Sequence, residues 1–379
     1  MTTLLPVPEI ALGADRIAGI AADAARFAGP AARILLVADP GLRGGAAARV
    51  AAALEAGRHR PILFAGLASN PGSAEIDAAA ALARSERAQL VIGLGGGSAL
   101  DVAKLAGAIA TAAESVEHYQ FCRNPLPARG LPVIAVPTTA GTGSETTTTA
   151  VFTNAAGKKA WAWGAELRST LAILDPTLSL SLPAALTAQT GIDALVHAIE
   201  AATNRNRSAA NDVSAHAAIR LIRRHLPEAV RQPGDLAARE AMLLASCLAG
   251  IAINNAGTAI GHNVAHALGS LVPIHHGRAA GLGLRASLAW NIAGAPEAWA
   301  GVAAAFGLGA ADVLPEAVDA FMREVGVKIA LADEFPALTP ERLAAEMALE
   351  ENASMRRANA RPAEDADLLA IARAVLAAA

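Results

Sequence analysis

The chain has 379 residues, of which 54% are hydrophobic and only 3% aromatic, and its formal net charge is −3, from 31 Lys and Arg against 34 Asp and Glu. This balance provides neither the basic stripe of a nucleic-acid-binding protein nor a charged tail. The two cysteines, Cys122 and Cys247, form no disulfide framework or metal motif, which fits a reducing compartment. The N-terminal segment lacks a basic leader, and no stretch reaches the ~18 unbroken apolar residues of a membrane span. We therefore expect a cytoplasmic protein that does not bind membranes.

Residues 1–180 alternate short apolar runs with helical patterns, as in the strand-like "RILLVAD" and the helix-like "GAAARVAAALEAG". The predicted strands are 33–39, 61–66, 88–97 and 131–137, and the predicted helices are 45–57, 73–86 and 99–113. Strand and helix in turn are typical of a parallel sheet with crossover helices. Residues 151–163 are predicted to form an edge hairpin with its turn at Asn154–Gly157.

Strand signals stop after residues 171–183, and glycine, proline and asparagine then separate a series of helical patterns. An apolar helix is expected around residues 191–200, followed by helices at 208–224, 235–252, 258–268, 278–291, 295–306, 314–325, 339–350 and 364–378. The sequence therefore predicts an α/β domain with a Rossmann-like parallel sheet at residues 1–180 and an all-helical domain at residues 181–379.

A glycine-rich turn follows the third predicted strand, in "VIGLGGGSALDVAK" (91–104). Glycines let a phosphate approach the backbone, and the start of the next helix offers free N–H groups and a positive dipole end. The pattern departs from the usual dinucleotide fingerprint, because its acidic candidate, Asp39, precedes the glycines. The glycine-rich turn can therefore be interpreted either as a binding site for a diphosphate or as an ordinary strand-to-helix turn. Taken alone, Asp39 fits a turn ahead of Pro40 and Gly41 better than a ribose contact.

A second polar loop, in "VIAVPTTAGTGSETT" (133–147), follows the next predicted strand. Its short hydroxyl side chains suit hydrogen bonds to phosphate, ribose or a carboxamide, although a surface loop of this composition is also ordinary. Both loops follow neighbouring parallel strands and therefore lie at one edge of the sheet, where α/β folds bind ligands.

Three segments of the second half combine histidine with apolar residues. "GIDALVHAIE" (191–200) places Asp193 and His197 on one helix face, and "IGHNVAHALG" (260–269) does the same for His262 and His266. "PIHHG" (273–277) follows with two adjacent histidines. A single histidine on an apolar face is usually a hydrogen-bonded core residue. Burying this many polar rings is costly unless they share a partner, and imidazoles with a carboxylate suit Fe²⁺ or Zn²⁺. There is no His-Glu-x-x-His motif of a metalloprotease.

With these motifs in order, the chain resembles the iron-containing (group III) alcohol dehydrogenase family nearly from end to end. The matching segments are "GGGSALDVAK", "PTTAGTGSE", "GIDALVHAIEA", "GHNVAHALG" and the His-Gly of "HHG". The resemblance implies an N-terminal nucleotide-binding α/β domain and a helical metal domain. The metal ligands that it implies are Asp193, His197, His262 and His276. His276 is preferred to His275 because the family's ligand directly precedes the glycine, and His266 matches a histidine near the nicotinamide.

The resemblance also implies sites for an NAD(H) cofactor. Gly96, Gly97 and Ser98 match the residues that hold the diphosphate. The other matching positions are Thr138, Thr139 and Thr142 along the cofactor, Lys159 at a ribose, Asp39 at the hydroxyls of the adenosine ribose, and Asn70 at a further cofactor contact. A carboxylate at the ribose hydroxyls predicts NAD(H) rather than NADP(H), since a 2′-phosphate brings like charge.

The chain departs from the family in several places. It has His275-His276-Gly277 where relatives often carry Pro-His-Gly, and "NARP" (359–362) where they carry Asn-Pro-Arg. Ile253 and Asn254 stand where relatives often have an aromatic residue, so the substrate pocket is expected to differ. Trp161 and Trp163 are further candidates for that pocket.

The implied reaction is the interconversion of a small alcohol and its aldehyde or ketone by hydride transfer to or from NAD, in a homodimer or higher homo-oligomer. One alternative is a maleylacetate reductase-like enzyme of the same superfold, but such proteins usually lack the full set of one aspartate and three histidines. A non-enzyme alternative is a nucleotide- and metal-binding sensor, for which no appended output domain is visible.

Overall fold

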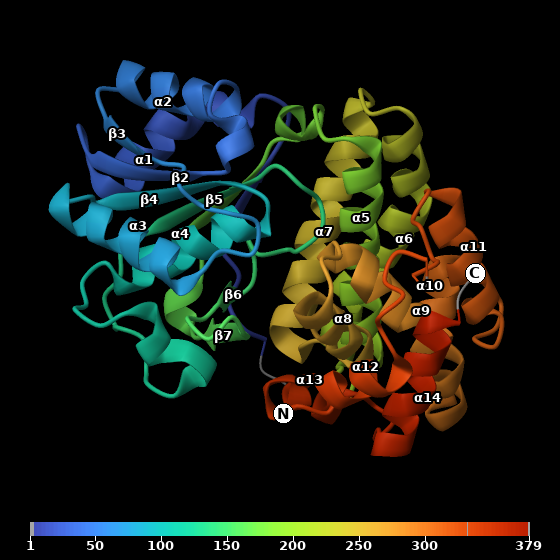
Figure 1. Cartoon of the computed structure of the whole chain (residues 1–379). Helices are drawn as coiled ribbons and strands as arrows, with labels where there is room; N and C mark the ends of the chain where they lie inside the picture. The colour runs from blue at the N-terminus through green and yellow to red at the C-terminus, as the bar shows by residue number, and fades with distance from the viewer. Residues whose placement is uncertain (1–3, 332, 378–379) are drawn as a thin grey trace. The chain divides into compact units, whose positions relative to one another are not determined.

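The computed structural model describes residues 4–331 and 333–377, which form two compact units (Figure 1). The α/β unit comprises Pro6–Thr139 and Gly143–Ser181. The helical unit comprises Leu4 and Leu5, Ala140–Thr142 and the chain from Leu182 onward. The predicted fold class, a parallel α/β part followed by a helical part, is confirmed.

A six-stranded parallel sheet with the order β1-β8-β5-β4-β2-β3 forms the centre of the α/β unit. Its strands are β1 (Glu9–Leu12), β2 (Arg33–Ala38), β3 (Arg60–Phe64), β4 (Leu90–Gly95), β5 (Val133–Pro137) and β8 (Leu171–Leu174). The four inner strands are almost completely buried, whereas the edge strands β1 and β3 are more exposed. Burial on both faces explains why the inner strands are continuous apolar runs.

Helices cover both faces of this sheet, with α1 and α2 above it and α3 and α4 below it in Figure 1. The bounds are α1 (Ile20–Ala28), α2 (Ala46–Ala56), α3 (Ser73–Ser85) and α4 (Gly97–Ile109). Because successive side chains of a strand point to opposite faces, Leu35 of β2 packs with α3 and α4, while Ile34 packs with α1 and α2.

The predicted hairpin is confirmed as β6 (Thr149–Thr153) and β7 (Lys159–Trp163), an antiparallel pair. It forms a two-stranded sheet of its own, however, and does not extend the edge of the main sheet. The sequence did not indicate strand β1 or helix α1. Strand β1 has only four residues, which are mostly exposed, so it lacks the buried apolar run by which the inner strands were found.

The described part of the helical unit contains ten α-helices. They are α5 (Ala184–Thr203), α6 (Ala209–Arg231), α7 (Leu236–Ala256), α8 (Ile260–Leu271), α9 (His276–Gly294), α10 (Ala300–Phe306), α11 (Leu314–Glu324), α12 (Pro340–Met347), α13 (Ala353–Ala358) and α14 (Asp365–Leu376). Helix α6 continues through Pro227, beyond the predicted end at residue 224, and α13 was not predicted. Residue 378 of the predicted helix 364–378 lies outside the described residues, as do residues 1–3, 332 and 379 of the two predicted domains.

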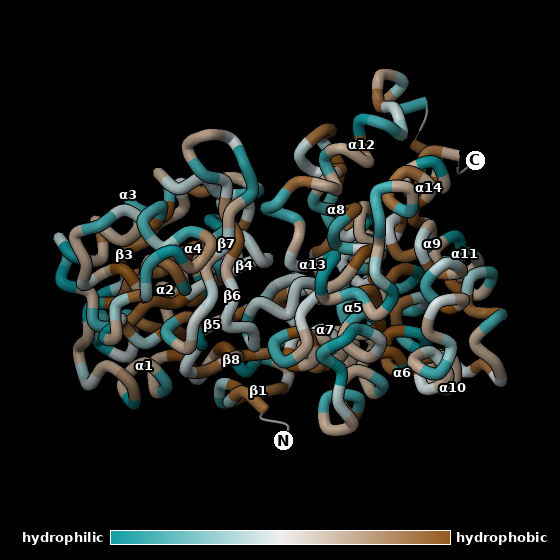
Figure 2. Tube along the Cα trace, turned by 90° about the horizontal axis from the view of Figure 1, so that it is seen from below, coloured by the Kyte–Doolittle hydropathy of each residue, from teal (hydrophilic) through white to brown (hydrophobic). Residues whose placement is uncertain are grey.

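Small residues let the helices of this unit approach one another closely. Helix α5 packs against α6, α7 and α9, and an added Cβ at Gly191 of α5 would lie 2.4 Å from Leu226 Cδ1 of α6. Helix α7, whose most apolar window of 18 residues has a mean hydropathy of 1.7, is the one helix among the described residues that is long and apolar enough to cross a membrane. Of this window, 56% is buried inside the protein, as is expected of a core helix. Figure 2 shows hydrophobic residues along the strands and within the helices, and hydrophilic residues both in the loops and on turns of the helices.

Candidate metal centre and cofactor loops

Helix α5 presents three ionisable side chains on one face, and its other residues are uncharged. Asp193, His197 and Glu200 occupy positions i, i+4 and i+7, and their relative exposures are only 2%, 5% and 3%. Burying such groups is unfavourable unless each one has a partner. The partners come from the start of α8 and the start of α9, both of which pack in the same unit.

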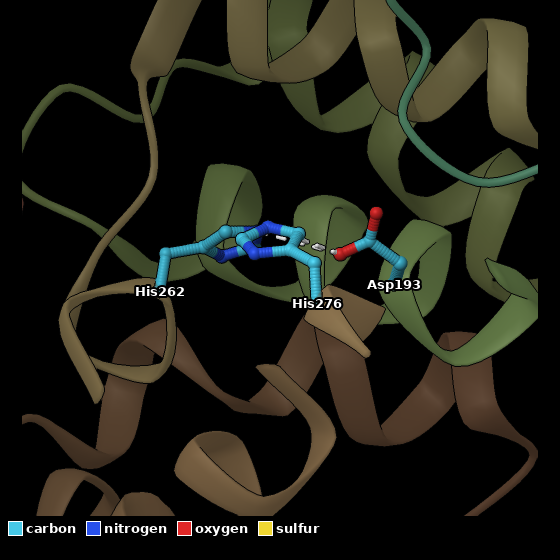
Figure 3. A group of neighbouring side chains, drawn as sticks. All are labelled: Asp193, His262 and His276. Carbon is cyan, nitrogen blue, oxygen red and sulfur yellow. Dashed lines mark ion pairs between the residues drawn. The ribbon is translucent and has the colours of Figure 1, made fainter. Parts of the chain in front are cut away.

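Three of the predicted metal ligands converge from these three helices (Figure 3). Asp193 Oδ1 lies 3.6 Å from His262 Nε2 and 3.8 Å from His276 Nε2, and the three ligand atoms lie within 4.8 Å of one another. Two ligand atoms each ~2.1 Å from a tetrahedral ion are ~3.4 Å apart. Asp193 Oδ1 and His262 Nε2 are buried, and neither has a hydrogen-bond partner among the described residues. The donor set and its spacing therefore fit a divalent metal ion.

The fourth predicted ligand, His197, lies against this group. Its ring stacks on that of His262, with 4.4 Å between the ring centroids and 16° between the planes. Its Nδ1 lies 3.3 Å from the carbonyl oxygen of Gly141, so Nδ1–H donates and Nε2 is left as the basic nitrogen. The structure thus brings His197 beside the three-residue cluster without adding its ring nitrogen to it, and its role as a ligand stays a prediction.

Glu200 is the principal residue that the sequence reasoning missed. Its carboxylate accepts from His262 Nδ1 at 2.7 Å, from the backbone N–H groups of Ala259 at 2.7 Å and Gly261 at 2.6 Å, and from the backbone N–H of His262 at 3.3 Å. It therefore ties the start of α8 to α5. The i, i+4, i+7 spacing of Asp193, His197 and Glu200 was visible in the sequence and is the signal that could have identified it.

The carboxylates create a strongly negative potential at the His262 ring. Burial lowers the pKa of His262, but Glu200 and Asp193 outweigh burial and raise it to about 9. Burial raises the pKa of Asp193, but His197, His276 and His262 hold it well below its usual range. The field that stabilises a proton on His262 Nε2 also stabilises a metal cation at the same nitrogen.

The two adjacent histidines have different environments. His275 is the N-cap of α9, and its Nδ1 accepts from the Gly277 N–H at 3.2 Å. His276 faces Asp193, and its side chain is 41% exposed. Its ring lies 5.7 Å from that of His266, edge to face. Gly277 lets the start of α9 approach α5 closely, since a Cβ at this position would lie 2.1 Å from the carbonyl oxygen of Gln189 in α5.

In the α/β unit, the glycine turn connects β4 to α4 and lies next to the end of β5. The Thr138 N–H donates to the Gly95 carbonyl at 2.9 Å, so the two predicted cofactor loops are neighbours. Gly95 has φ +150°, and a Cβ on it would lie 2.8 Å from Ala99 Cβ and 3.1 Å from Asp39 Cβ. Asp39 therefore lies at the carboxyl end of β2, beside the glycine turn, as predicted from the strand pattern.

Several predicted cofactor residues are linked around this turn. The Asn70 N–H donates to Ser98 Oγ at 3.3 Å, and Lys159 Nζ donates to Asn70 Oδ1 at 2.6 Å. Gly96 and Thr139 are also adjacent, because a Cβ on Gly96 would lie 3.5 Å from Thr139 Oγ1. Gly97 is the first residue of α4. These open glycine and hydroxyl positions at a helix start fit a dinucleotide diphosphate.

Two predicted cofactor residues need a separate description. Asp39 Oδ1 accepts from the Gly41 N–H at 2.9 Å, so the turn role is present and one carboxylate oxygen is engaged in it. Thr142 belongs to the short stretch Ala140–Thr142 that is grouped with the helical unit.

The candidates for the substrate pocket are divided between the units. Trp161 and Trp163 are on β7 of the α/β unit, whereas Ile253 and Asn254 are on α7 of the helical unit.

A buried lysine behind the second loop was also missed. Lys104 of α4 is fully buried, and its Nζ donates to the carbonyl oxygens of Ser144 at 2.9 Å and Thr149 at 2.6 Å. Asp101 accepts from Ser144 Oγ at 2.5 Å and from the Val151 N–H at 2.9 Å. Helix α4 therefore holds the segment from the second loop into β6. Most of these partners are backbone carbonyls and N–H groups, which carry no sequence signal.

Comparisons with known proteins cover the whole chain. The model of the family "Iron-containing alcohol dehydrogenase" matches residues 7–176, and that of "Fe-containing alcohol dehydrogenase family, C-terminal" matches residues 187–376. The 1,3-propanediol dehydrogenase of Klebsiella pneumoniae is 35% identical over 364 residues, which are 90% of each chain. The probable alcohol dehydrogenase EutG of Escherichia coli is 42% identical over 60% of each chain.

Solved structures agree with these relatives. A 1,3-propanediol oxidoreductase is 32% identical, with a TM-score of 0.90 over 99% of this chain and 100% of that one. The sulfoacetaldehyde reductase of Bifidobacterium kashiwanohense in complex with NAD⁺ is 30% identical, with a TM-score of 0.90 over 99% of both chains.

Proposed function

This chain belongs to the iron-containing alcohol dehydrogenase family and is an NAD-linked alcohol oxidoreductase. We propose that it interconverts a small alcohol and its aldehyde or ketone, and that it does so at one divalent metal ion, Fe²⁺ or Zn²⁺. The proposed ligands are Asp193, His197, His262 and His276. The observation that carries the proposal is the approach of Asp193 Oδ1, His262 Nε2 and His276 Nε2 to within 4.8 Å of one another. Two of these atoms, Asp193 Oδ1 and His262 Nε2, are buried without a hydrogen-bond partner in the part of the chain that the structure describes.

A divalent ion at such a site lowers the pKa of an alcohol hydroxyl and polarises a carbonyl group. The residues of the chain prepare this chemistry. Asp193 would contribute one negative charge, and each imidazole would contribute one ring nitrogen, which is deprotonated when the metal binds. The His276 side chain is 41% exposed, so part of the cluster is accessible to a substrate and to water. We assign His266 to proton transfer or to positioning of the nicotinamide, not to metal binding.

The cofactor proposal is NAD(H), which accepts or donates the hydride. A similar solved structure contains NAD⁺. In this chain the diphosphate is assigned to the turn at Gly96, Gly97 and Ser98, next to Thr138 and Thr139. Thr142, Lys159 and Asn70 are assigned to the rest of the cofactor, and Asp39 to the ribose hydroxyls. The second carboxylate oxygen of Asp39 is the acceptor proposed for them, since the first is engaged with Gly41.

The relatives are named as alcohol dehydrogenases for substrates of very different size, since they include a methanol dehydrogenase and a long-chain-alcohol dehydrogenase. We propose that the substrate is a short alcohol and that the enzyme is a cytoplasmic homodimer or larger homo-oligomer. Neither cysteine forms a disulfide within the described residues, which suits the reducing cytoplasm. Light scattering on the purified protein tests the oligomeric state.

One experiment tests the activity and the metal together. The purified protein is analysed for bound metal, and NADH oxidation is then followed at the nicotinamide absorbance with a panel of short aldehydes and ketones. We expect about one divalent ion per chain and oxidation of NADH with at least one member of the panel. A fully active protein without metal, or no turnover with any carbonyl compound after loading with Fe²⁺ or Zn²⁺, would contradict the proposal.

A further inference from the structure

The carboxylate of Glu200 is buried among N–H donors on every side that the structure describes. Oε2 accepts from His262 Nδ1 and from the Ala259 N–H, both at 2.7 Å. Oε1 accepts from the Gly261 N–H at 2.6 Å and from the His262 N–H at 3.3 Å. Since both oxygens are engaged in this way, Glu200 is not itself a candidate for the metal.

These bonds determine which nitrogen of His262 faces the cluster. A carboxylate only accepts hydrogen bonds, so His262 Nδ1 must carry the proton that lies between them. The other nitrogen, Nε2, faces Asp193 Oδ1, 3.6 Å away, and is the nitrogen that a metal ion would bind in place of a proton. We propose that Glu200 is the positioning residue of the metal centre, which fixes the tautomer and orientation of His262 and strengthens it as a ligand. This role rests on the proposed function.

The same side chain also places the ligand in space. Ala259 is the N-cap of α8, and its N–H and that of Gly261 have Glu200 as their acceptor. Gly261 is required for this contact, because a Cβ there would lie 2.8 Å from Glu200 Oε1. One carboxylate on α5 therefore holds both the backbone and the ring of His262. Outer carboxylate partners of metal-bound histidines typically contribute roughly 10- to 100-fold to metal affinity.

Replacing Glu200 by glutamine gives a sharp test, because an amide has one acceptor oxygen and one NH₂ donor. If the NH₂ group faces His262 Nδ1, that nitrogen must accept, and the ring proton moves to Nε2, where the metal should bind. If the NH₂ group faces the Gly261 N–H, two donors oppose each other and His262 loses its backbone anchor. Either arrangement weakens the metal site while the shape of the side chain is retained.

Asp175→Asn is the matched control. Asp175 is fully buried, and its carboxylate also accepts on both oxygens, from the N–H groups of Ile17 at 3.0 Å, Asp15 at 3.1 Å and Thr177 at 3.0 Å. It contacts no histidine ring among the described residues and belongs to the α/β unit. This variant therefore reproduces the loss of a buried carboxylate without altering a metal ligand.

The experiment measures Co²⁺ binding to the metal-free full-length proteins by the ligand-field absorption of the ion, with thermal unfolding followed in parallel. We expect Glu200→Gln to bind Co²⁺ roughly 10- to 100-fold more weakly and with an altered spectrum. Asp175→Asn should lose stability but keep the affinity and spectrum of the unmodified protein. Equal Co²⁺ affinity and spectra in Glu200→Gln and the unmodified protein would overturn the role of Glu200 alone. Absence of Co²⁺ binding by the unmodified protein would overturn the proposed metal site as well.

A second measurement decides the matter if Glu200→Gln does not fold. Nitrogen NMR of the imidazoles in the unmodified, Zn²⁺-loaded protein should show His262 coordinated through Nε2, with a slowly exchanging proton on Nδ1. Coordination through Nδ1, or an Nδ1 without a proton, would overturn the proposal.

Discussion

Separate alanine substitutions of His275 and His276 are expected to affect two different properties. His276 Nε2 lies 3.8 Å from Asp193 Oδ1, and its side chain is 41% exposed. His276→Ala should therefore lose bound metal and most of the activity. On the metal-free protein it should change the free energy of unfolding by only about 0.5 kcal/mol, because the His276 side chain is 41% exposed. His275→Ala should keep the metal and retain activity.

The magnitude for His275 follows from its position at the N-terminus of α9. Its Nδ1 accepts from the Gly277 N–H at 3.2 Å, which satisfies one of the four N–H groups that a helix start leaves without a partner. Loss of an N-cap costs about 1 kcal/mol. His275→Asn should restore most of this free energy, because asparagine is among the best N-cap residues.

Both properties are measured on the same preparations. Metal content is determined by atomic spectroscopy, turnover with NADH and an aldehyde, and stability by urea unfolding of the metal-free proteins. Equal loss of metal from both alanine variants, or retention of metal in His276→Ala only, would refute the assignment of one histidine to the metal and the other to the helix cap.

Three further predictions concern other residues. His266→Ala should keep the metal but reduce turnover and change its pH dependence; loss of the metal in this variant would make His266 a ligand. The unmodified enzyme should prefer NAD(H) to NADP(H), and Asp39→Gly should relax that preference mainly through KM; preference for NADPH in steady-state kinetics would show that Asp39 does not face the ribose. Burial raises the pKa of Glu145 to about 7, above the 4.5 expected when it is exposed. The protonated carboxyl group is therefore tolerated in the folded protein, whereas the charged form is not. Its contribution to the free energy of unfolding should be highest below pH 4.5 and should fall as the pH rises through 7. Between about pH 5 and about pH 8, Glu145→Gln should therefore gain up to ~3 kcal/mol in the free energy of unfolding relative to the unmodified protein; parallel pH profiles from urea unfolding would contradict this.

Much of the fold could be predicted from the sequence, because its inner strands are buried on both faces. Continuous apolar runs such as "RILLVA" and "LVIGLG" are the direct consequence of that burial, and they separate clearly from the helices between them. The short, exposed strand β1 has no such requirement and was missed. The hairpin was predicted from its turn residues. Its local sequence does not show that it forms a separate sheet, because that depends on whether its strands form hydrogen bonds with the strands of the main sheet.

The candidate metal site divides in the same way. Helical spacing alone placed Asp193 with His197, and His262 with His266, on common faces. Only the packing of α5, α8 and α9 shows that Asp193, His262 and His276 meet in one place. The partners of Glu200 and Lys104 are mostly backbone groups, which every residue carries and no residue type reveals. Likewise His275 and His276 are adjacent and chemically identical in the sequence, and it is the direction of the chain as α9 begins that turns one ring back to cap the helix and the other toward the carboxylate of Asp193.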